Sequence, residues 1–340
     1  MPSMRLLHYS LALAMTALLG GLLAAEVRAA TVSVPVSGAS TASASAAPVA
    51  AAAPAIPAGS TVPPLLPPPI PGLREHLRVD RAVRVVLDIG QPQPARLTAL
   101  ASLRQAARVG DGEAQFVLGS MYMWGPRHPA TLLPKDLAKA QIYLSHAATQ
   151  GWLQAMAAMA EINLQLGHPK TATVWALADY SFSGARHYTR EGYLADLLHR
   201  CLRALPVAEQ KRALTDANGF IARYRNDVLA GRAMAGPVDS CPLQMRSARR
   251  RRVPQTLGNV MVFSREVPRS GDAMFLLAVD RSGHVRQLLP VSAFPSWQVM
   301  RILQPLARDT RFNAALGCST PLRWTMAPFD FGNGHYRLNR

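Results

Sequence analysis

The spacing of apolar residues divides this chain into four parts with different predicted structures. Leu11–Ala25 is an uncharged apolar run, and Ala29–Leu73 contains no charged side chain. From Gly72 to about Ala235, apolar residues recur at the helical spacing i, i+3, i+4 and i+7. After Gly236, short apolar runs separated by turn residues are typical of strands. The pattern predicts a leader at 1–29, a linker at 30–71, a helical domain at 72–235 and a small α/β domain at 236–340.

The N-terminal run has the features of an export signal. Arg5 supplies a basic start, and Val27-Arg28-Ala29 places small residues where signal peptidase needs them, so Ala30 is the predicted first residue of the mature chain. The alternative is a retained inner-membrane anchor, because Leu6–Ala25 spans 20 residues. Both alternatives place the rest of the chain outside the cytoplasm, and the first predicts a periplasmic protein. The linker ends in the proline-rich Pro63–Pro71, a predicted spacer, with a ligand for a groove-binding partner as the alternative.

Two segments of the helical region carry the same pattern. The pair Ala106-Ala107 recurs as Ala147-Ala148, 41 positions later, and so does the glycine that follows each pair. A repeat of this length predicts stacked helix pairs, each burying a face against its neighbours. Further helices are predicted at Thr189–Ala204 and Val207–Ala230.

The first repeat resembles the Sel-one-like repeat, a relative of the tetratricopeptide repeat. The matching residues are Ala106-Ala107, Gly110, Ala114-Gln115, Leu118-Gly119, Tyr122, Gly125, Asp136, Lys139-Ala140, Tyr143, Ala147-Ala148 and Gly151. The second repeat is degraded, and residues 127–134 are a predicted loop insertion in the first. The resemblance covers about Leu97–Gly184 and implies a protein-interaction scaffold with an exposed concave surface. We expect the aromatic residues of this region to pack in its core.

The C-terminal part is predicted to have the order strand, turn, strand, helix, strand. The predicted strands are Ala273–Val279, His284–Val291 and Leu322–Phe331, and the helix follows Pro295. Residues 332–335 are a predicted flexible tail. This order describes a small sheet with a helix on one face.

The same layout resembles the C-terminal domain of the energy-transducing protein TonB. The matching residues are Val279-Asp280-Arg281-Ser282-Gly283-His284-Val285, Arg311-Phe312-Asn313-Ala314-Ala315, Trp324, Phe329 and Phe331. The helix that precedes the first strand in the family is missing from this chain. The resemblance implies binding through pairing of a sheet edge with a short partner segment, and it assigns Arg323, Trp324, Thr325 and Met326 to that edge. The predicted fold is therefore a degenerate helix-pair solenoid followed by a TonB-like sheet-plus-helix domain.

Only three cysteines are present, which excludes a disulfide-rich scaffold and a four-cysteine zinc site. Cys241 and Cys318 flank the C-terminal domain, and in an oxidising compartment we expect them to pair. Pairing of Cys201 with Cys241 is the alternative. Cys201 lies among leucines, where a buried thiol is the simplest expectation.

The chain is strongly basic, with 37 Lys and Arg against 20 Asp and Glu and a formal charge of +17. The densest run is Arg249, Arg250, Arg251 and Arg252. This run predicts contact with an anionic surface, such as lipid head groups or an acidic protein face, with a solvated linker as the alternative. Export argues against nucleic acid as the partner.

No motif for catalysis or cofactor binding is found. The chain lacks a His-Glu-x-x-His pair, a cysteine pair at zinc spacing, a P-loop, a Gly-x-Ser-x-Gly elbow and a dinucleotide glycine motif. We expect Glu161 and Asp179, on the helical repeats, to be surface charges or helix caps. The sequence thus predicts no enzyme activity and no cofactor.

These features together predict a non-enzymatic envelope protein that binds other proteins through its helical surface and its sheet edge. The expected partners are envelope proteins, including an outer-membrane protein, or an anionic lipid surface. One alternative is an energy transducer of the TonB type, anchored in the inner membrane by an uncleaved leader. A second alternative is an envelope enzyme or an accessory of a cell-wall complex.

Overall fold

The computed structural model describes residues 73–130, 132–183, 191–234, 243–246, 268–313, 321–332 and 335–338. All of them belong to one structural unit, residues 57–340. The predicted leader and linker lie outside the described residues.

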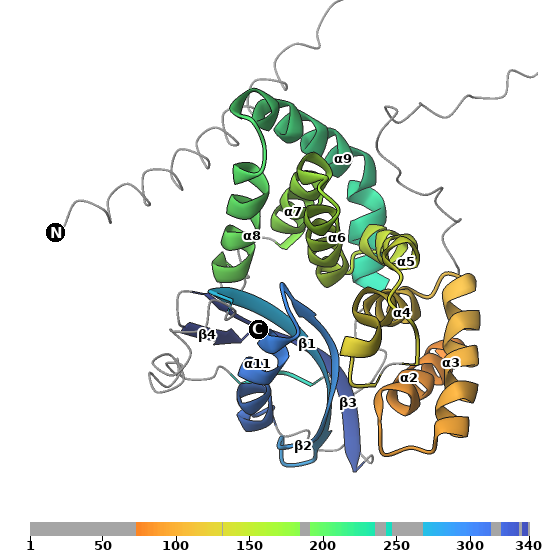
Figure 1. The fold of residues 1–340 in the computed structure, drawn as a ribbon. Helices are drawn as coiled ribbons and strands as arrows, with labels where there is room; N and C mark the ends of the chain where they lie inside the picture. The colour runs from red at the N-terminus through yellow and green to blue at the C-terminus, as the bar shows by residue number, and fades with distance from the viewer. Residues whose placement is uncertain are drawn as a thin grey trace, which may run out of the picture. The chain divides into compact units, whose positions relative to one another are not determined.

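A series of α-helices occupies the described residues from 73 to 234 (Figure 1). Their bounds are α2 (Leu73–Leu87), α3 (Gln93–Arg108), α4 (Gly112–Trp124), α5 (Leu137–Thr149), α6 (Leu153–Gln165), α7 (Pro169–Ser183), α8 (Glu191–Arg203) and α9 (Val207–Met234). From α2 to α8 each helix packs against the next, and the long α9 lies against α5 and α7. The predicted helical character of this region is confirmed.

Local sequence explains where the helices of the first repeat begin and how closely they pack. Asp111 and Asp136 cap α4 and α5, because their carboxylates accept the amides of Ala114 (2.8 Å) and Lys139 (2.9 Å). Gly119 allows α4 and α5 to approach each other, since a Cβ there would lie 2.6 Å from Leu144 Cγ. A larger residue at this position would require Leu144 to shift.

The aromatic residues fill the space between the helices, as expected. The ring of Phe116 stacks on Trp152 with centroids 5.3 Å apart, and Tyr122 stacks on Tyr143 at 5.9 Å. Trp124 instead meets Trp297, which comes from the C-terminal part of the chain, edge-on at 5.7 Å. The helical region is therefore packed against the C-terminal part.

The C-terminal part forms an antiparallel sheet with the strand order β2-β1-β3-β4. The strands are β1 (Ser270–Asp280), β2 (Val285–Phe294), β3 (Leu322–Gly332) and β4 (His335–Leu338), and α11 (Gln298–Asp309) lies between β2 and β3 in sequence. The combination of helices with a small antiparallel sheet confirms the α+β class. The prediction of a flexible tail at 332–335 is wrong, because Gly332 pairs with His335 and the chain returns as β4 along the end of β3.

Both faces of the sheet are covered, not one as predicted. Phe275 and Leu277 of β1 belong to the apolar cluster that contains α11. Met274 and Leu276, which point the other way, belong to the cluster formed with the helices. On the face opposite α11, the sheet is contacted mainly by α2, α4, α6 and α8, every second helix of the helical region. The sheet thus occupies one surface of the helical region (Figure 1).

The backbones of a helix and a strand lie close together where α8 meets the end of β3. A Cβ added to Gly192 would lie 2.8 Å from the Cα of Gly332, and one added to Gly332 would overlap the backbone of Gly192. Two glycines are therefore required for the two backbones to lie this close.

Candidate functional site

The outer edge of β2 is blocked against pairing with a further strand. Pro290 has no amide hydrogen to offer, and the register of β2 with β1 shifts twice. The backbone carbonyl of Val291 is bound to His128, whose Nε2 lies 3.1 Å from it. Proline, irregular register and a covering loop are the features that protect sheet edges from strand addition.

His128 holds the connection between α4 and α5 against this edge. The amide of Ala130 donates to its Nδ1 at 3.1 Å, so Nε2 carries the hydrogen and donates to Val291. The ring is 1% exposed and lies 4.8 Å from the ring of Trp297. Burial lowers the pKa of His128 to about 4, and the Arg96 guanidinium nearby acts in the same direction. The imidazole is therefore neutral at neutral pH.

The opposite edge of the sheet is only half covered. β3 pairs with β1 from Leu322 to Gly332 without any register shift. β4 pairs only with Phe329–Gly332. Among the described residues no strand pairs with the outer side of Leu322–Pro328, a segment that we call the open edge.

The position of Pro328 indicates which backbone groups face outward along the open edge. Proline cannot donate to β1, so its pair with Met274 is expected to be one that exchanges no hydrogen bonds. Because hydrogen-bonding direction alternates along a strand, the amides of Trp324 and Met326 then point away from β1. These amides and their carbonyls are what a further strand would bind.

The four residues predicted for partner binding all lie on this segment, but their side chains alternate between the two faces. Trp324 and Met326 pack against the helices, and the Arg84 guanidinium carbon lies 5.4 Å from the centre of the Trp324 ring. Arg323 is 4% exposed, and Thr325 is half-buried. The segment therefore offers backbone groups more than side chains.

A buried acidic residue, missed by the sequence analysis, lies between α6 and α8. Glu161 is 2% exposed, which corrects the expectation of a surface charge. Its carboxylate accepts the hydroxyl of Tyr193 at 2.9 Å and the guanidinium of Arg200 at 3.0 Å. Asp179 is likewise buried, and the Ser183 hydroxyl donates to it at 3.1 Å. The sequence does contain one sign that Glu161 is buried, because it is the only charged residue of α6.

Two groups beside Glu161 have pKa values that burial raises. Burial and the nearby Glu161 carboxylate raise the pKa of Tyr193 well above its usual range. Burial raises the pKa of the Cys201 thiol to about 12, with Glu161 adding to the effect, so the reactive thiolate is scarce at neutral pH. Cys201 is buried and forms no disulfide, which confirms the expectation of a buried thiol.

Two other predicted sites lie outside the described residues. These are the disulfide of Cys241 with Cys318 and the run Arg249, Arg250, Arg251 and Arg252. Within the described ranges no group of His, Cys, Asp and Glu side chains could hold a metal ion. Over the same ranges no helix is long and apolar enough to cross a membrane.

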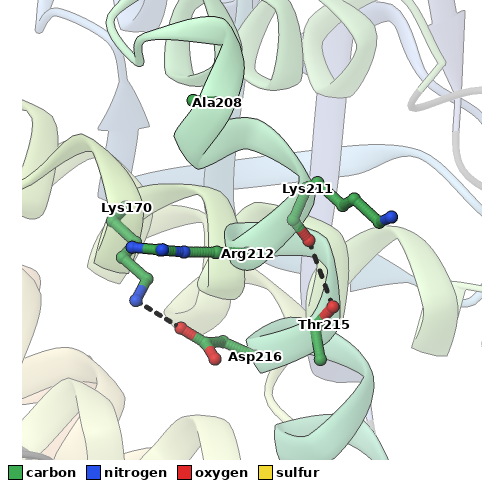
Figure 2. A pocket seen from close by; sticks show the side chains of 6 residues that line it. All are labelled: Lys170, Ala208, Lys211, Arg212, Thr215 and Asp216. Atoms are coloured by element: carbon green, nitrogen blue, oxygen red, sulfur yellow. Dashed lines mark hydrogen bonds and ion pairs between the residues drawn. The ribbon is translucent and has the colours of Figure 1, made fainter.

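A hollow of about 350 Å³ lies between the start of α7 and α9 (Figure 2). Its cations are Lys170, Lys211 and Arg212. Lys170 is paired with Asp216 at 2.7 Å, and the Thr215 hydroxyl donates to a backbone carbonyl at 3.1 Å. Because this ion pair is about half exposed on both sides, the hollow is a wide surface depression and not an enclosed site.

Comparison with known proteins does not assign the chain to a family. No family model matches the chain, and neither a curated protein nor a solved structure matches it.

Proposed function

We propose that this chain is a non-enzymatic envelope protein that binds an extended segment of another protein along the open edge. One observation carries the proposal. Leu322–Pro328 pair regularly with β1 but with no other described strand on their outer side. A partner strand added there would gain main-chain hydrogen bonds, and alternate side chains would give specificity.

The proposal also assigns a family resemblance to each of the two parts of the chain. The helical region is a degenerate Sel-one-like array, and the sheet with α11 is a TonB-like module. Support for the first comes from the capped, closely packed α4 and α5, and for the second from the strand order with its helix. The predicted leader supports a periplasmic location.

The charge of this chain and the exposure of Leu322 indicate what kind of segment would bind along the open edge. The chain carries a formal charge of +17, and Arg84 lies against Trp324 on the open edge. Leu322, at the start of the edge, is 42% exposed. A neutral or acidic extended segment with an apolar residue opposite Leu322 fits these features.

Photo-crosslinking in intact cells tests the proposal. A photoreactive amino acid replaces Leu322, and the same residue replaces the exposed Tyr180 of α7 as a positional control. We expect a discrete protein adduct from position 322 and none from position 180. The substitution Thr325→Lys should remove the adduct, because a lysine on an edge strand disfavours strand addition.

The matched control is Thr98→Lys, which makes the same chemical change on the exposed surface of α3. This variant should leave the adduct unchanged. Equal adducts from positions 322 and 180, or an adduct that persists in Thr325→Lys, would contradict binding along the edge.

A further inference from the structure

A small crevice lies where the helical region meets the connection between β2 and α11. Its volume is about 120 Å³. Met123 and Trp124, at the end of α4, are its buried residues, and Pro295 and Ser296 form the opposite wall. The exposed Arg127 and Lys135 stand at its rim, and none of the described residues that line it carries a carboxylate. The lining is therefore electropositive.

The fold of one loop brings the two cations together. Gly125 ends α4 with φ +50, and a Cβ at this position would overlap the backbone of Lys135. The amide of Asp136 donates to the carbonyl of Tyr122 at 2.9 Å, which closes the loop at the same point. Arg127, just after Gly125, and Lys135 thus stand on one rim although they are far apart along the loop.

Two of the residues that line the crevice carry a buried hydrogen-bonding atom that has no partner among the described residues. The indole Nε1 of Trp124 is one of them, and Trp124 is only 6% exposed. An indole N–H can only donate. The hydroxyl of Ser296 is the other. Because buried donors without partners cost free energy, they point to an acceptor that completes the site.

The start of α11 adds to the positive potential. The helix begins beside Ser296, whose carbonyl accepts the amide of Val299 at 3.2 Å. Its N-cap residue is Trp297, and no side chain caps the helix there. The amide of Met300 is bonded in the same way to the carbonyl of Trp297, so the start of α11 favours negative charge mainly through the helix dipole.

We infer that this crevice binds an oxyanion group, a phosphate or a carboxylate, between the Trp124 indole, the Ser296 hydroxyl and the Arg127 and Lys135 cations. Its volume of about 120 Å³ is well below the roughly 300 Å³ at which drug-sized ligand pockets begin. That space admits a small free anion or the charged end of a larger molecule, but not a drug-sized ligand. The site is separate from the open edge, so its function does not depend on strand addition.

Nuclear magnetic resonance of the indole groups tests the inference. The full chain is labelled with ¹⁵N-tryptophan, and the Trp124 signal is identified by its loss in Trp124→Phe. Inorganic phosphate and acetate are titrated separately at constant ionic strength. We expect a saturable shift of the Trp124 indole signal with at least one anion, while the signal of Trp175, in the core between α7 and α9, stays in place.

Variants of the rim separate binding from a general salt effect. Arg127→Gln and Lys135→Gln each remove one charged donor from an exposed position, and each should weaken binding about tenfold. Lys211→Gln removes a cation from the depression beside α7 and should leave the affinity unchanged. Saturation by phosphate alone would identify a phosphate site, and saturation by acetate alone a carboxylate site.

The inference is overturned if neither anion gives a saturable shift. It is also overturned if Arg127→Gln, Lys135→Gln and Lys211→Gln all bind as the original chain does. Because both rim residues are exposed, their substitution should leave the fold intact, and matching thermal unfolding curves would verify this.

Discussion

Acid should weaken the contact that His128 makes between the α4–α5 connection and the sheet. The neutral ring uses both nitrogens, with Nδ1 accepting the amide of Ala130 and Nε2 donating to Val291. Protonation would destroy the first bond and place a second buried cation near Arg96, which itself donates to the carbonyls of Val86 and Ala130. The folded state therefore resists protonation of this residue.

The pKa of His128 is about 4 in the folded chain, against 6.5 for an ordinary histidine, and this difference makes the stability of the fold depend on pH. Because the folded pKa is the lower one, His128 contributes its full stability above pH 6.5. As pH falls, the unfolded chain takes up the proton first, and this contribution is lost between about pH 6.5 and pH 4. The loss amounts to about 2 kcal/mol at pH 5 and about 3 kcal/mol below pH 4, at about 1.4 kcal/mol for each pKa unit.

Denaturant unfolding of the chain and of His128→Gln, from pH 7.5 to pH 5, measures this loss. The variant removes the titrating group. The contributions of all other histidines are the same in both proteins and cancel when one free energy of unfolding is subtracted from the other. We expect that difference to shrink by about 2 kcal/mol over this range. A difference that is constant with pH would refute the argument. If the variant does not fold, the ring signals of His128 give the second readout, since they should remain those of a neutral imidazole down to pH 5.

Further substitutions test the packing and the cysteine pairing. Glu161→Gln should lower the free energy of unfolding by about 2–3 kcal/mol, because the Arg200 guanidinium loses its buried carboxylate partner and keeps only the half-buried Asp196, 2.9 Å from its Nε. Calorimetry would measure this loss, and a loss below about 0.5 kcal/mol would contradict the stabilising role of Glu161. Gly332→Ala should lower the free energy of unfolding by about 2 kcal/mol, because its Cβ forces β3 away from α8. The control is Gly219→Ala in α9, whose added Cβ has nothing within 4 Å and which should raise the free energy of unfolding by about 0.5–1 kcal/mol. Equal effects of the two substitutions would show that the close approach of β3 and α8 does not require a glycine. Non-reducing peptide mapping should find Cys241 joined to Cys318, and two free thiols would refute the predicted bridge.

Local patterns were enough to predict the helices and the three longer strands. Helical spacing is a short-range signal, and strand β1 follows from its apolar run Ala273–Val279. That run is continuous and not alternating, which is typical of a strand buried on both faces. The prediction of a sheet covered on one face overlooked this signal.

Contacts between distant parts of the chain were not predictable from such patterns. His128 and Val291 are 163 residues apart, and Glu161 and Arg200 are 39 apart. Nothing in the spacing of apolar residues pairs them, because the first contact depends on how the sheet packs against the helices and the second on how α6 packs against α8. The open edge was predicted from family resemblance, but its length was not. That length is set by β4, which pairs with β3 only as far as Phe329.

Amide hydrogen exchange along β3 is the most direct test of the central claim that a partner pairs with the open edge. The protein adduct formed through position 322 is purified and compared with the free chain carrying the same substitution. Protection should rise at the amides of Trp324 and Met326, which point away from β1, and stay unchanged at Thr325 and Ala327, which already face β1. Unchanged exchange at Trp324 and Met326 in the adduct would contradict strand addition at this edge.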